Sequence, residues 1–216
     1  MNKQVTVVES RAIFYLLSKL RDKNTISKDF MIYGDRLMRI LAEEVLCRLP
    51  SIDIGLIETP CGQYRGLIDH NEESNICAVS IVRSGDILLE AIRYIQPGIK
   101  VGKILIQRDE STESKTPVLY YKKLPKDINE CIVILVDPML ATGGSARKAI
   151  SVLLESGILQ EQIIFANLIC CEEGLTNVLK DYPNIKIITM AVDSQLNKDK
   201  YIIPGLGDYG DRYYST

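Results

Sequence analysis

Histidine is almost absent from this chain, and its scarcity excludes several kinds of active site. The one histidine among the 216 residues is His70, which stands in the polar segment Asp-His-Asn-Glu-Glu and has the ordinary interpretation of an exposed turn residue. A Ser–His triad would need His70 itself, and a metal site built from several histidines is excluded. We therefore expect chemistry based on aspartate, arginine, lysine, backbone amides and a metal ion held largely by its substrate.

Paired-cysteine spacing is also missing. The chain has no C-x-x-C motif, and several of its six cysteines lie in apolar runs. That pattern is typical of reduced core residues in a cytosolic protein, and it gives little support to a structural zinc site. The six cysteines are Cys47, Cys61, Cys77, Cys131, Cys170 and Cys171.

The sequence has neither a basic excess nor a long apolar run. Its formal net charge is −2 and its pI is about 5.6, so no strong positive field attracts nucleic acid. No apolar stretch reaches the roughly 18 residues of a membrane span, and residues 1–10 lack the apolar core of a signal peptide. The length fits one domain over residues 1–216. We expect a cytoplasmic protein without nucleic-acid or membrane partners.

Apolar segments of the strand type alternate with helical segments along the chain. This order predicts an α/β fold with a doubly wound, mostly parallel sheet flanked by helices. Helices are expected at 11–20, from an N-cap at Thr25 or Ser27 to Pro50, at 86–94 and at 146–154. Strands are expected at 76–82, 101–107, 131–136, 163–169 and 185–192, with an antiparallel hairpin at 52–70 and no periodic structure in the tail 201–216.

Three polar clusters follow predicted strand ends. They are Arg83-Ser84-Gly85, Arg108-Asp109-Glu110 and the segment from Asp137 to Ser145. Ligands of parallel α/β sheets bind beyond the carboxyl ends of the strands, so these clusters should converge on one crevice. Their composition favours a substrate rich in phosphate.

Residues 131–150 combine a buried strand, a loop of small residues and a helix. Cys131 to Val136 is apolar and largely β-branched, and Asp137-Pro138 ends that strand. The small residues from Ala141 to Ser145 let a backbone approach a ligand closely, and the helix directs free N–H groups into the loop. This arrangement suits a ribose 5-phosphate, with the loop on the phosphate and Asp137 on the sugar hydroxyls. The spacing is neither a Walker A nor a dinucleotide motif, and a plain strand-to-helix turn is the alternative.

At this level of detail the sequence resembles the uracil phosphoribosyltransferases. Residues 137–145 (DPMLATGGS) are similar to the phosphoribosyl diphosphate loop of that family, and residues 201–212 (YIIPGLGDYGDR) to its uracil-binding segment. Residues 104–110 and 123–125 match its β-arm region, and the likeness runs from about residue 20 to the end. The resemblance implies a type I phosphoribosyltransferase core with a β-arm at 110–125 and a base-binding hood at 193–216. The implied reaction converts uracil and 5-phospho-α-D-ribose 1-diphosphate to UMP and diphosphate in pyrimidine salvage.

The resemblance also implies roles for individual residues. Asp137, Arg108 and Asp208 would be catalytic, and Mg²⁺ would be held mainly by the substrate, with Asp208 reaching it through water. Uracil would contact Met139, Ile202, Gly207, Asp208 and Tyr209. Phosphoribosyl diphosphate would contact Arg83, Ser84, Gly85, Arg108, Asp137, Pro138, Met139, Leu140, Ala141, Thr142, Gly143, Gly144, Ser145 and Asp208.

Two positions depart from the pattern of the family. Ser84 stands where alanine is usual, and the chain ends in Tyr214-Ser215-Thr216 instead of Phe-Gly-Thr. Three other functions stay open at this point: a regulator that binds RNA, an inactive relative, and a transferase for another base. Its acidic pI weighs against the first, and the intact phosphate loop, arginines and tail weigh against the second.

An extended arm needs a partner to cover it, so we expect a homodimer in which residues 110–125 reach across. Some relatives are activated by GTP at a subunit interface and form tetramers. The sequence leaves that question open, with Arg21 and Arg36 as candidates for such a site.

Several side chains have a plainer interpretation that stays open. Asp208 and Asp211 could be turn formers, and Arg83 could belong to a surface ion pair. Tyr120-Tyr121 is typical of arm packing, and Asp193 of a structural contact.

Overall fold

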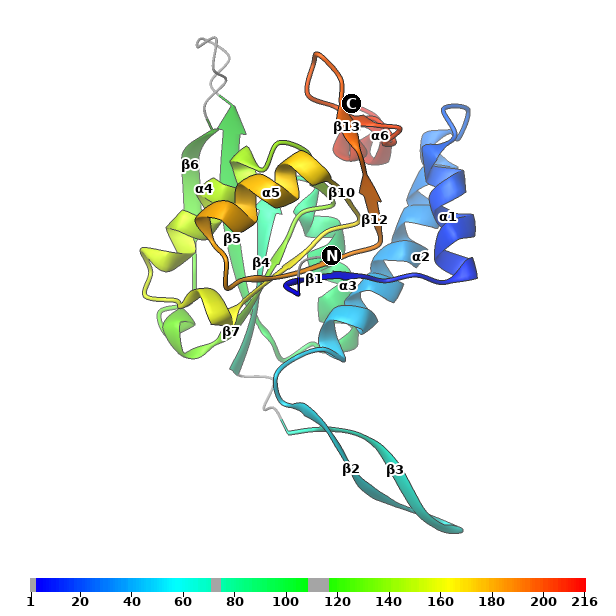
Figure 1. Ribbon diagram of the computed structural model, residues 1–216, viewed down its shortest axis with the longest axis vertical. Coiled ribbons are helices and arrows are strands. Elements are labelled where there is room, and N and C mark those ends of the chain that lie inside the picture. The colour runs from blue at the N-terminus through cyan, green and yellow to red at the C-terminus, as the bar shows by residue number, and fades with distance from the viewer. Residues whose placement is uncertain (1–2, 71–74, 109–116) are drawn as a thin grey trace.

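The described part of the chain forms a central sheet with helices on both faces (Figure 1). The computed structural model describes residues 3–70, 75–108 and 117–216. The large sheet has the order β1-β11-β9-β7-β4-β5-β6, and every neighbouring pair is parallel except β5 and β6. The chain runs outward from β4 to β5 and β6 and then returns to β7 on the other side of β4. The predicted doubly wound α/β fold is therefore confirmed.

The secondary-structure elements have the following bounds. The large sheet contains β1 (Val5–Val7), β4 (Ile76–Val82), β5 (Lys100–Arg108), β6 (Pro117–Lys123), β7 (Ile132–Val136), β9 (Ile163–Ala166) and β11 (Lys186–Thr189). The smaller sheets contain β2 (Ile52–Thr59), β3 (Gly62–Asp69), β8 (Met139–Leu140), β10 (Ile169–Cys171), β12 (Ala191–Asp193), β13 (Gln195–Leu196) and β14 (Ile202–Ile203). The helices are α1 (Arg11–Arg21), α2 (Ser27–Leu46), α3 (Gly85–Ile95), α4 (Gly144–Leu154), α5 (Glu172–Asp181) and α6 (Tyr209–Tyr214), with short 3-10 turns at Ile128–Glu130 and Gln160–Gln162.

Two apolar layers stabilise the sheet, one on each face. Strands β4, β7 and β9 are buried along almost their whole length, as their continuous apolar sequences predict. One layer packs α1, α2 and α3 against the sheet through residues such as Leu37 and Leu88. The other packs α4 and α5 against the opposite face through residues such as Ile150 and Val178. The loops at the carboxyl edge of the sheet are therefore attached to a rigid, fully covered core.

Several expected boundaries are wrong for identifiable reasons. The strand expected at 163–169 breaks after Ala166, because the N–H of Leu168 turns to donate to Pro138 O at 2.9 Å. The strand expected at 185–192 divides around Met190 in the same way. The later halves, β10 and β12, form a separate parallel sheet with β8.

The start of α2 and the tail also differ from expectation. Ile26 is the N-cap of α2 and makes no side-chain capping bond, whereas Thr25 Oγ1 donates to Lys19 O at 2.6 Å. The tail expected to lack periodic structure contains β14 and α6. Asp208 caps α6 by accepting a hydrogen bond from the N–H of Asp211 at 2.9 Å, and six helical residues are too few to show a period.

The most extended feature of the molecule is the antiparallel hairpin of β2 and β3, which projects from the body in Figure 1. Its apolar side chains are strongly exposed: Leu56 is 66% exposed, Tyr64 61% and Leu67 60%. The β-arm expected at 110–125 is described only from residue 117, where β6 pairs with β5, and its residues 110–116 lie outside the described part of the chain.

All six cysteines are free, and Cys47 and Cys61 are the exposed ones. Across the described ranges, no helix has the length and apolar character needed to cross a membrane.

We predict that Gly85→Ala strongly destabilises the protein. A Cβ at this position would lie 2.4 Å from Val136 O and 2.9 Å from Ser80 Oγ, which are both held in the buried sheet. Overpacking of this kind costs about 1–3 kcal/mol, so the midpoint of thermal unfolding should fall by several degrees. Gly144→Ala is the matched control, because its nearest neighbour would be Pro117 Cγ at 3.5 Å. Equal midpoints for the two variants would contradict the prediction.

Candidate functional site

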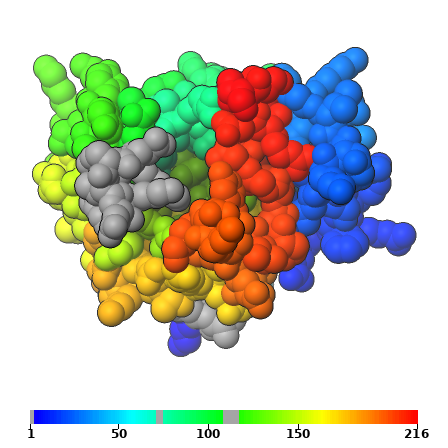
Figure 2. Space-filling view, turned by 90° about the horizontal axis from the view of Figure 1, so that it is seen from above, coloured from blue at the N-terminus to red at the C-terminus, as the bar shows by residue number. Residues whose placement is uncertain are grey.

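A cavity of about 650 Å³ opens at the carboxyl edge of the sheet. Figure 2 looks onto the molecule from above, and the C-terminal segment, in orange and red, covers part of this face. The cavity is bounded by the ends of β4 and β7, by the loop that leads into α4 and by the hood segment 193–216. It brings together most of the residues expected to bind substrate: Ser84, Asp137, Met139, Leu140, Ala141, Thr142, Gly143, Gly144, Ser145, Ile202, Gly207, Asp208 and Tyr209.

The loop of residues 141–145 is shaped for an anion. Gly143 has a φ of +85°, and a Cβ there would lie 3.1 Å from Val178 Cγ2, so a side chain is disfavoured by both conformation and space. Helix α4 begins at Gly144 with no acidic residue in its first turn, and its first N–H groups are free of helical partners. A helix start of this kind binds phosphate through N–H groups and the helix dipole.

Helix α5 fixes this loop from behind. The side-chain amide of Asn177 donates to Thr142 O at 3.0 Å. Gly174 lies so close to the loop that a Cβ on it would be 2.3 Å from Ala141 O. The backbone of the loop is therefore preorganised, with its shape set by a helix that the sequence analysis did not predict.

Asp137 stands at the end of β7, where burial controls its charge. Removal from water raises the pKa of its carboxyl group to about 7, and the negative charge of Asp208 acts in the same direction. Hydrogen bonds from the backbone N–H of Met139 and from Ser84 Oγ, the latter at 3.3 Å, oppose that increase in pKa. The carboxyl group can thus gain or lose a proton close to neutral pH.

The hood contributes Ile202 and the segment Gly207 to Gly210 to the cavity. Gly207 has a φ of +85°, and Asp208 directs its carboxylate to the start of α6. The side chain of Tyr209 is only 1% exposed and packs into the core, edge-on to Phe30 at 5.2 Å between ring centroids. A Cβ added to Gly34 would lie 2.6 Å from the hydroxyl of Tyr209. Tyr209 therefore lines the cavity with its backbone, while its ring holds the hood on α2.

Three of the expected residues do not line the cavity: Arg83, Gly85 and Pro138. A fourth, Arg108, has a side chain outside the described part of the structure. Arg83 donates to Asp211 Oδ1 at 2.6 Å and to Thr216 Oγ1 at 2.9 Å, so its guanidinium holds the chain end. This contact lowers the pKa of Asp211. Gly85 provides close packing of α3 on β7, and Pro138 is buried beside β10. Arg108 is the last residue of β5, and the structure describes its backbone alone.

The cavity also includes residues that sequence reasoning missed. Asp199, Lys200 and Tyr201 line it from the turn between β13 and β14. Asn197 Oδ1 fixes this turn by accepting hydrogen bonds from the N–H groups of Asp199 and Tyr201, both at 2.9 Å. The polar run Asn-Lys-Asp-Lys is a recognisable turn signal. Ile106, by contrast, lies in an apolar strand and carries no signal of a site.

Two aspartates, Asp137 and Asp208, line the cavity and are close enough for the charge of Asp208 to act on Asp137. Within the described ranges, no group of three or more histidine, cysteine, aspartate or glutamate side chains is arranged to hold a metal ion. A cation in the cavity would therefore take part of its oxygen ligands from substrate and water.

Comparisons with known proteins agree with this geometry. A sequence model of the family described as uracil phosphoribosyltransferase matches residues 7–216. The uracil phosphoribosyltransferase of Saccharomyces cerevisiae is 44% identical over 207 residues, which cover 95% of this chain and 93% of that protein. The uracil phosphoribosyltransferase of Dictyostelium discoideum is 46% identical over 202 residues, covering 93% and 91%. Among solved structures, the AQ2163 protein of Aquifex aeolicus is similar with a TM-score of 0.81 and 30% identity over 98% of each chain.

We predict that Asp137→Asn stabilises the fold at high pH but not at low pH. Because the folded-state pKa of about 7 lies above the ordinary value of 3.8, the folded protein keeps a proton that the unfolded chain releases. The cost of burying the carboxylate therefore grows between about pH 4 and pH 7, to at most about 4 kcal/mol. Thermal unfolding of both proteins across this range should show a midpoint difference that increases with pH. A difference independent of pH would contradict the assignment.

Proposed function

The chain belongs to the uracil phosphoribosyltransferase family, and on that premise we propose how its cavity converts uracil and 5-phospho-α-D-ribose 1-diphosphate to UMP and diphosphate. The reaction is a pentosyl transfer in nucleotide salvage. One observation chiefly supports this function: the loop of residues 141–145 (the anion loop), Asp137 and residues of the hood border a single cavity. Substrate positioning by these three groups would supply most of the catalysis.

The loop of residues 141–145 would bind the 5-phosphate through backbone N–H groups at the start of α4. Asp137 lies next to this loop in the sequence and faces the same cavity, so its carboxyl group would accept hydrogen bonds from the ribose hydroxyls. As the bond from C1 to the diphosphate breaks, positive charge develops on the ribose. A carboxylate at Asp137 would stabilise that charge.

The leaving diphosphate would be bound by Arg108 and by the segment from Arg83 to Gly85. Arginine suits this role because its planar group contacts two oxygens and stays charged. Arg83 is paired with Asp211 in this structure, and both side chains are about half exposed. Exposed ion pairs contribute little stability, so Arg83 can leave Asp211 and bind the diphosphate at little cost in free energy.

Mg²⁺ fits the carboxylates described above. Asp208 would hold the ion through water and Asp137 would lie beside it, with diphosphate and ribose oxygens completing the coordination. When bound, the ion supplies positive charge that offsets the charge developing on the leaving diphosphate. Asp208 also keeps its place as the cap of α6, which couples the metal side of the cavity to the hood.

Uracil would be recognised by the backbone of Gly207 to Tyr209, with Ile202 and Met139 as apolar walls. The base offers an acceptor at O4 and a donor at N3, and cytosine reverses both. A fixed backbone N–H and C=O would leave unpaired groups against the wrong base, which is a strong basis for selectivity.

A homodimer is the oligomer that we propose. The exposed apolar side chains of the β2–β3 hairpin form a surface that isolated soluble proteins rarely present on a two-stranded extension. This hairpin is a better-supported contact segment than residues 110–125, of which residues 110–116 lie outside the described chain.

We also propose a cytoplasmic location, and a test for activation by GTP, with any change from dimer to tetramer, follows from the resemblance to relatives that GTP activates. Of the two candidate arginines, Arg21 is engaged within the chain by Asp193. Arg36 is exposed on α2 and is the residue to test for GTP.

We expect uracil, but not cytosine, adenine or hypoxanthine, to be turned over with phosphoribosyl diphosphate and Mg²⁺. The measurement is nucleotide formation across this panel of bases, with and without GTP and with EDTA as a control. Faster turnover of a purine would reject the proposed base site. Turnover that persists in EDTA would reject the role of the metal.

We expect Asp137→Asn to lower kcat by about 100-fold or more, because it removes the charge that faces the developing cation. Asp127→Asn is the control, since Asp127 pairs with Lys100 and does not line the cavity. Steady-state kinetics of both variants, with circular dichroism to verify folding, gives the answer. A folded Asp137→Asn enzyme with normal kcat would exclude the role of the carboxylate.

A further inference from the structure

We infer that Arg21 and Asp193 form a clamp on Gly205 that positions the uracil-reading turn, which makes Arg21 a positioning residue for the base. The inference rests on the proposed function, in which the base contacts the backbone of residues 207–209. Arg21 is the last residue of α1, a helix that contributes no residue to the lining of the cavity.

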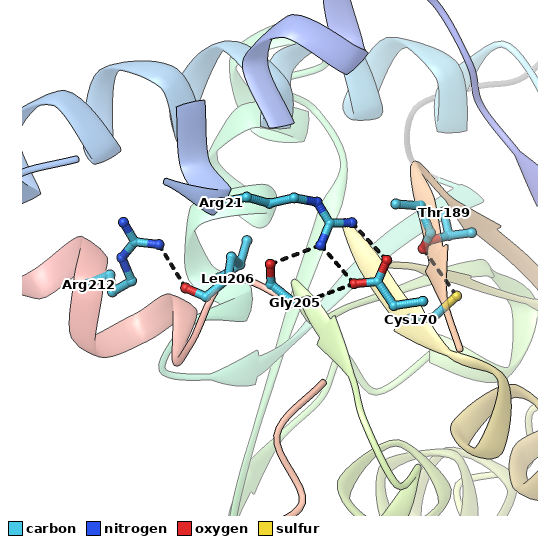
Figure 3. A network of polar contacts seen from close by, with 8 residues as sticks. Arg21, Cys170, Thr189, Gly205, Leu206 and Arg212 are labelled. Atoms are coloured by element: carbon cyan, nitrogen blue, oxygen red, sulfur yellow. Dashed lines mark hydrogen bonds and ion pairs between the residues drawn. The ribbon is translucent and has the colours of Figure 1, made fainter. Parts of the chain in front are cut away.

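The clamp holds both polar groups of one residue (Figure 3). Arg21 Nη1 donates to Gly205 O at 2.8 Å and to Asp193 Oδ2 at 2.7 Å, and Nη2 donates to Asp193 Oδ1 at 2.9 Å. The same Asp193 Oδ2 accepts a hydrogen bond from the N–H of Gly205 at 2.9 Å. The N–H and C=O of Gly205 are thus bound by the two partners of one ion pair.

Gly205 lies at a tight point of this turn. Its φ is +52°, and a Cβ would lie 2.1 Å from Ile202 O, so the chain folds back tightly on itself. Ile202 before it and Gly207 after it both line the cavity. A clamp on Gly205 therefore fixes the relative position of two groups that would contact uracil.

A second arginine anchors the other side of the turn to the same end of α1. Arg212 Nη1 donates to Leu206 O at 2.7 Å and to Leu20 O, and Nη2 donates to Asp22 O at 2.8 Å (Figure 3 shows the contact with Leu206). The end of α1 thus contacts the turn through both arginines, and displacement of either would release one side of the hood.

Burial and charge indicate positioning as the main role of the pair. The side chain of Asp193 is 8% exposed and that of Arg21 24%, so both groups lose much of their hydration. A buried pair gains little net stability after that loss, whereas its two-point geometry strongly fixes orientation. Lysine cannot reproduce the planar fork that contacts both carboxylate oxygens.

The clamp does not contact the groups that would bind the 5-phosphate and the ribose. The anion loop belongs to α4 and Asp137 to the end of β7, and neither contacts Arg21 among the described bonds. Loss of the clamp should therefore affect uracil and leave phosphoribosyl diphosphate nearly unaffected.

The test is a steady-state comparison of Arg21→Met with Arg48→Met. Arg48 pairs with Glu44 on α2 and does not line the cavity, so it controls for the loss of an arginine. We expect Arg21→Met to raise the KM for uracil about tenfold or more, with the KM for phosphoribosyl diphosphate within about twofold. Arg21→Lys should restore part of the uracil KM. A merely structural role would reduce the amount of folded enzyme without moving either KM, and that result would overturn the inference.

A second variant covers the case in which a lone buried carboxylate prevents folding. Arg21→Met/Asp193→Asn removes both charges, and hydrogen exchange of the amides of residues 202–210 is measured on it without substrate. Faster exchange than in the original protein and in Arg48→Met supports the clamp, and unchanged exchange overturns it. If the original protein fails to use uracil, the proposed function fails, and the exchange result still decides whether the turn is clamped.

Discussion

The parallel pairing of β4 with β7 brings chain segments far apart in the sequence to one edge of the sheet. The two strands are in register from Ile76 opposite Ile132 to Ser80 opposite Val136. Both strands therefore end at the same edge of the sheet, β7 at Val136 and β4 at Val82, and Ser84 Oγ reaches Asp137 Oδ1 at 3.3 Å across 53 positions of sequence. Both strands are buried on both faces, so this edge is fixed by the apolar core. The anion loop and the loop after β4 depend on that fixed edge for their geometry.

The role of each aspartate in and around the site depends on what surrounds its carboxyl group. The carboxyl group of Asp137 is withdrawn from water, and its pKa rises to about 7. Asp211 is exposed beside Arg83, and its pKa is lowered. Asp193 is buried but paired through both oxygens. The three aspartates illustrate how one side chain can serve as a titrating group, an exposed anchor and a buried structural anion within one fold.

The parts of the fold that can be predicted from the sequence are those determined by residues close together in the chain. The strand at 131–136, the small residues at 141–145 and the hairpin at 52–70 each carry a complete pattern within a short segment. The break after Ala166 is hard to predict, because Asn167 is a single polar residue in an otherwise apolar run and the distant Pro138 O turns the chain. The same holds along the cavity: the loop residues 141–145 and Asp137 form a local pattern in the sequence, whereas the pairing of Arg83 with Asp211 joins positions 128 residues apart.

The contact between Gly34 and Tyr209 has an evolutionary consequence. Because the hydroxyl of Tyr209 occupies the space of a Cβ at position 34, the two positions cannot vary independently. An alanine at 34 becomes acceptable only after the residue at 209 loses its hydroxyl or its ring, and the reverse order of substitution passes through a clash. Positions 34 and 209 should therefore covary among relatives, and the permitted order of substitutions would run through 209 first.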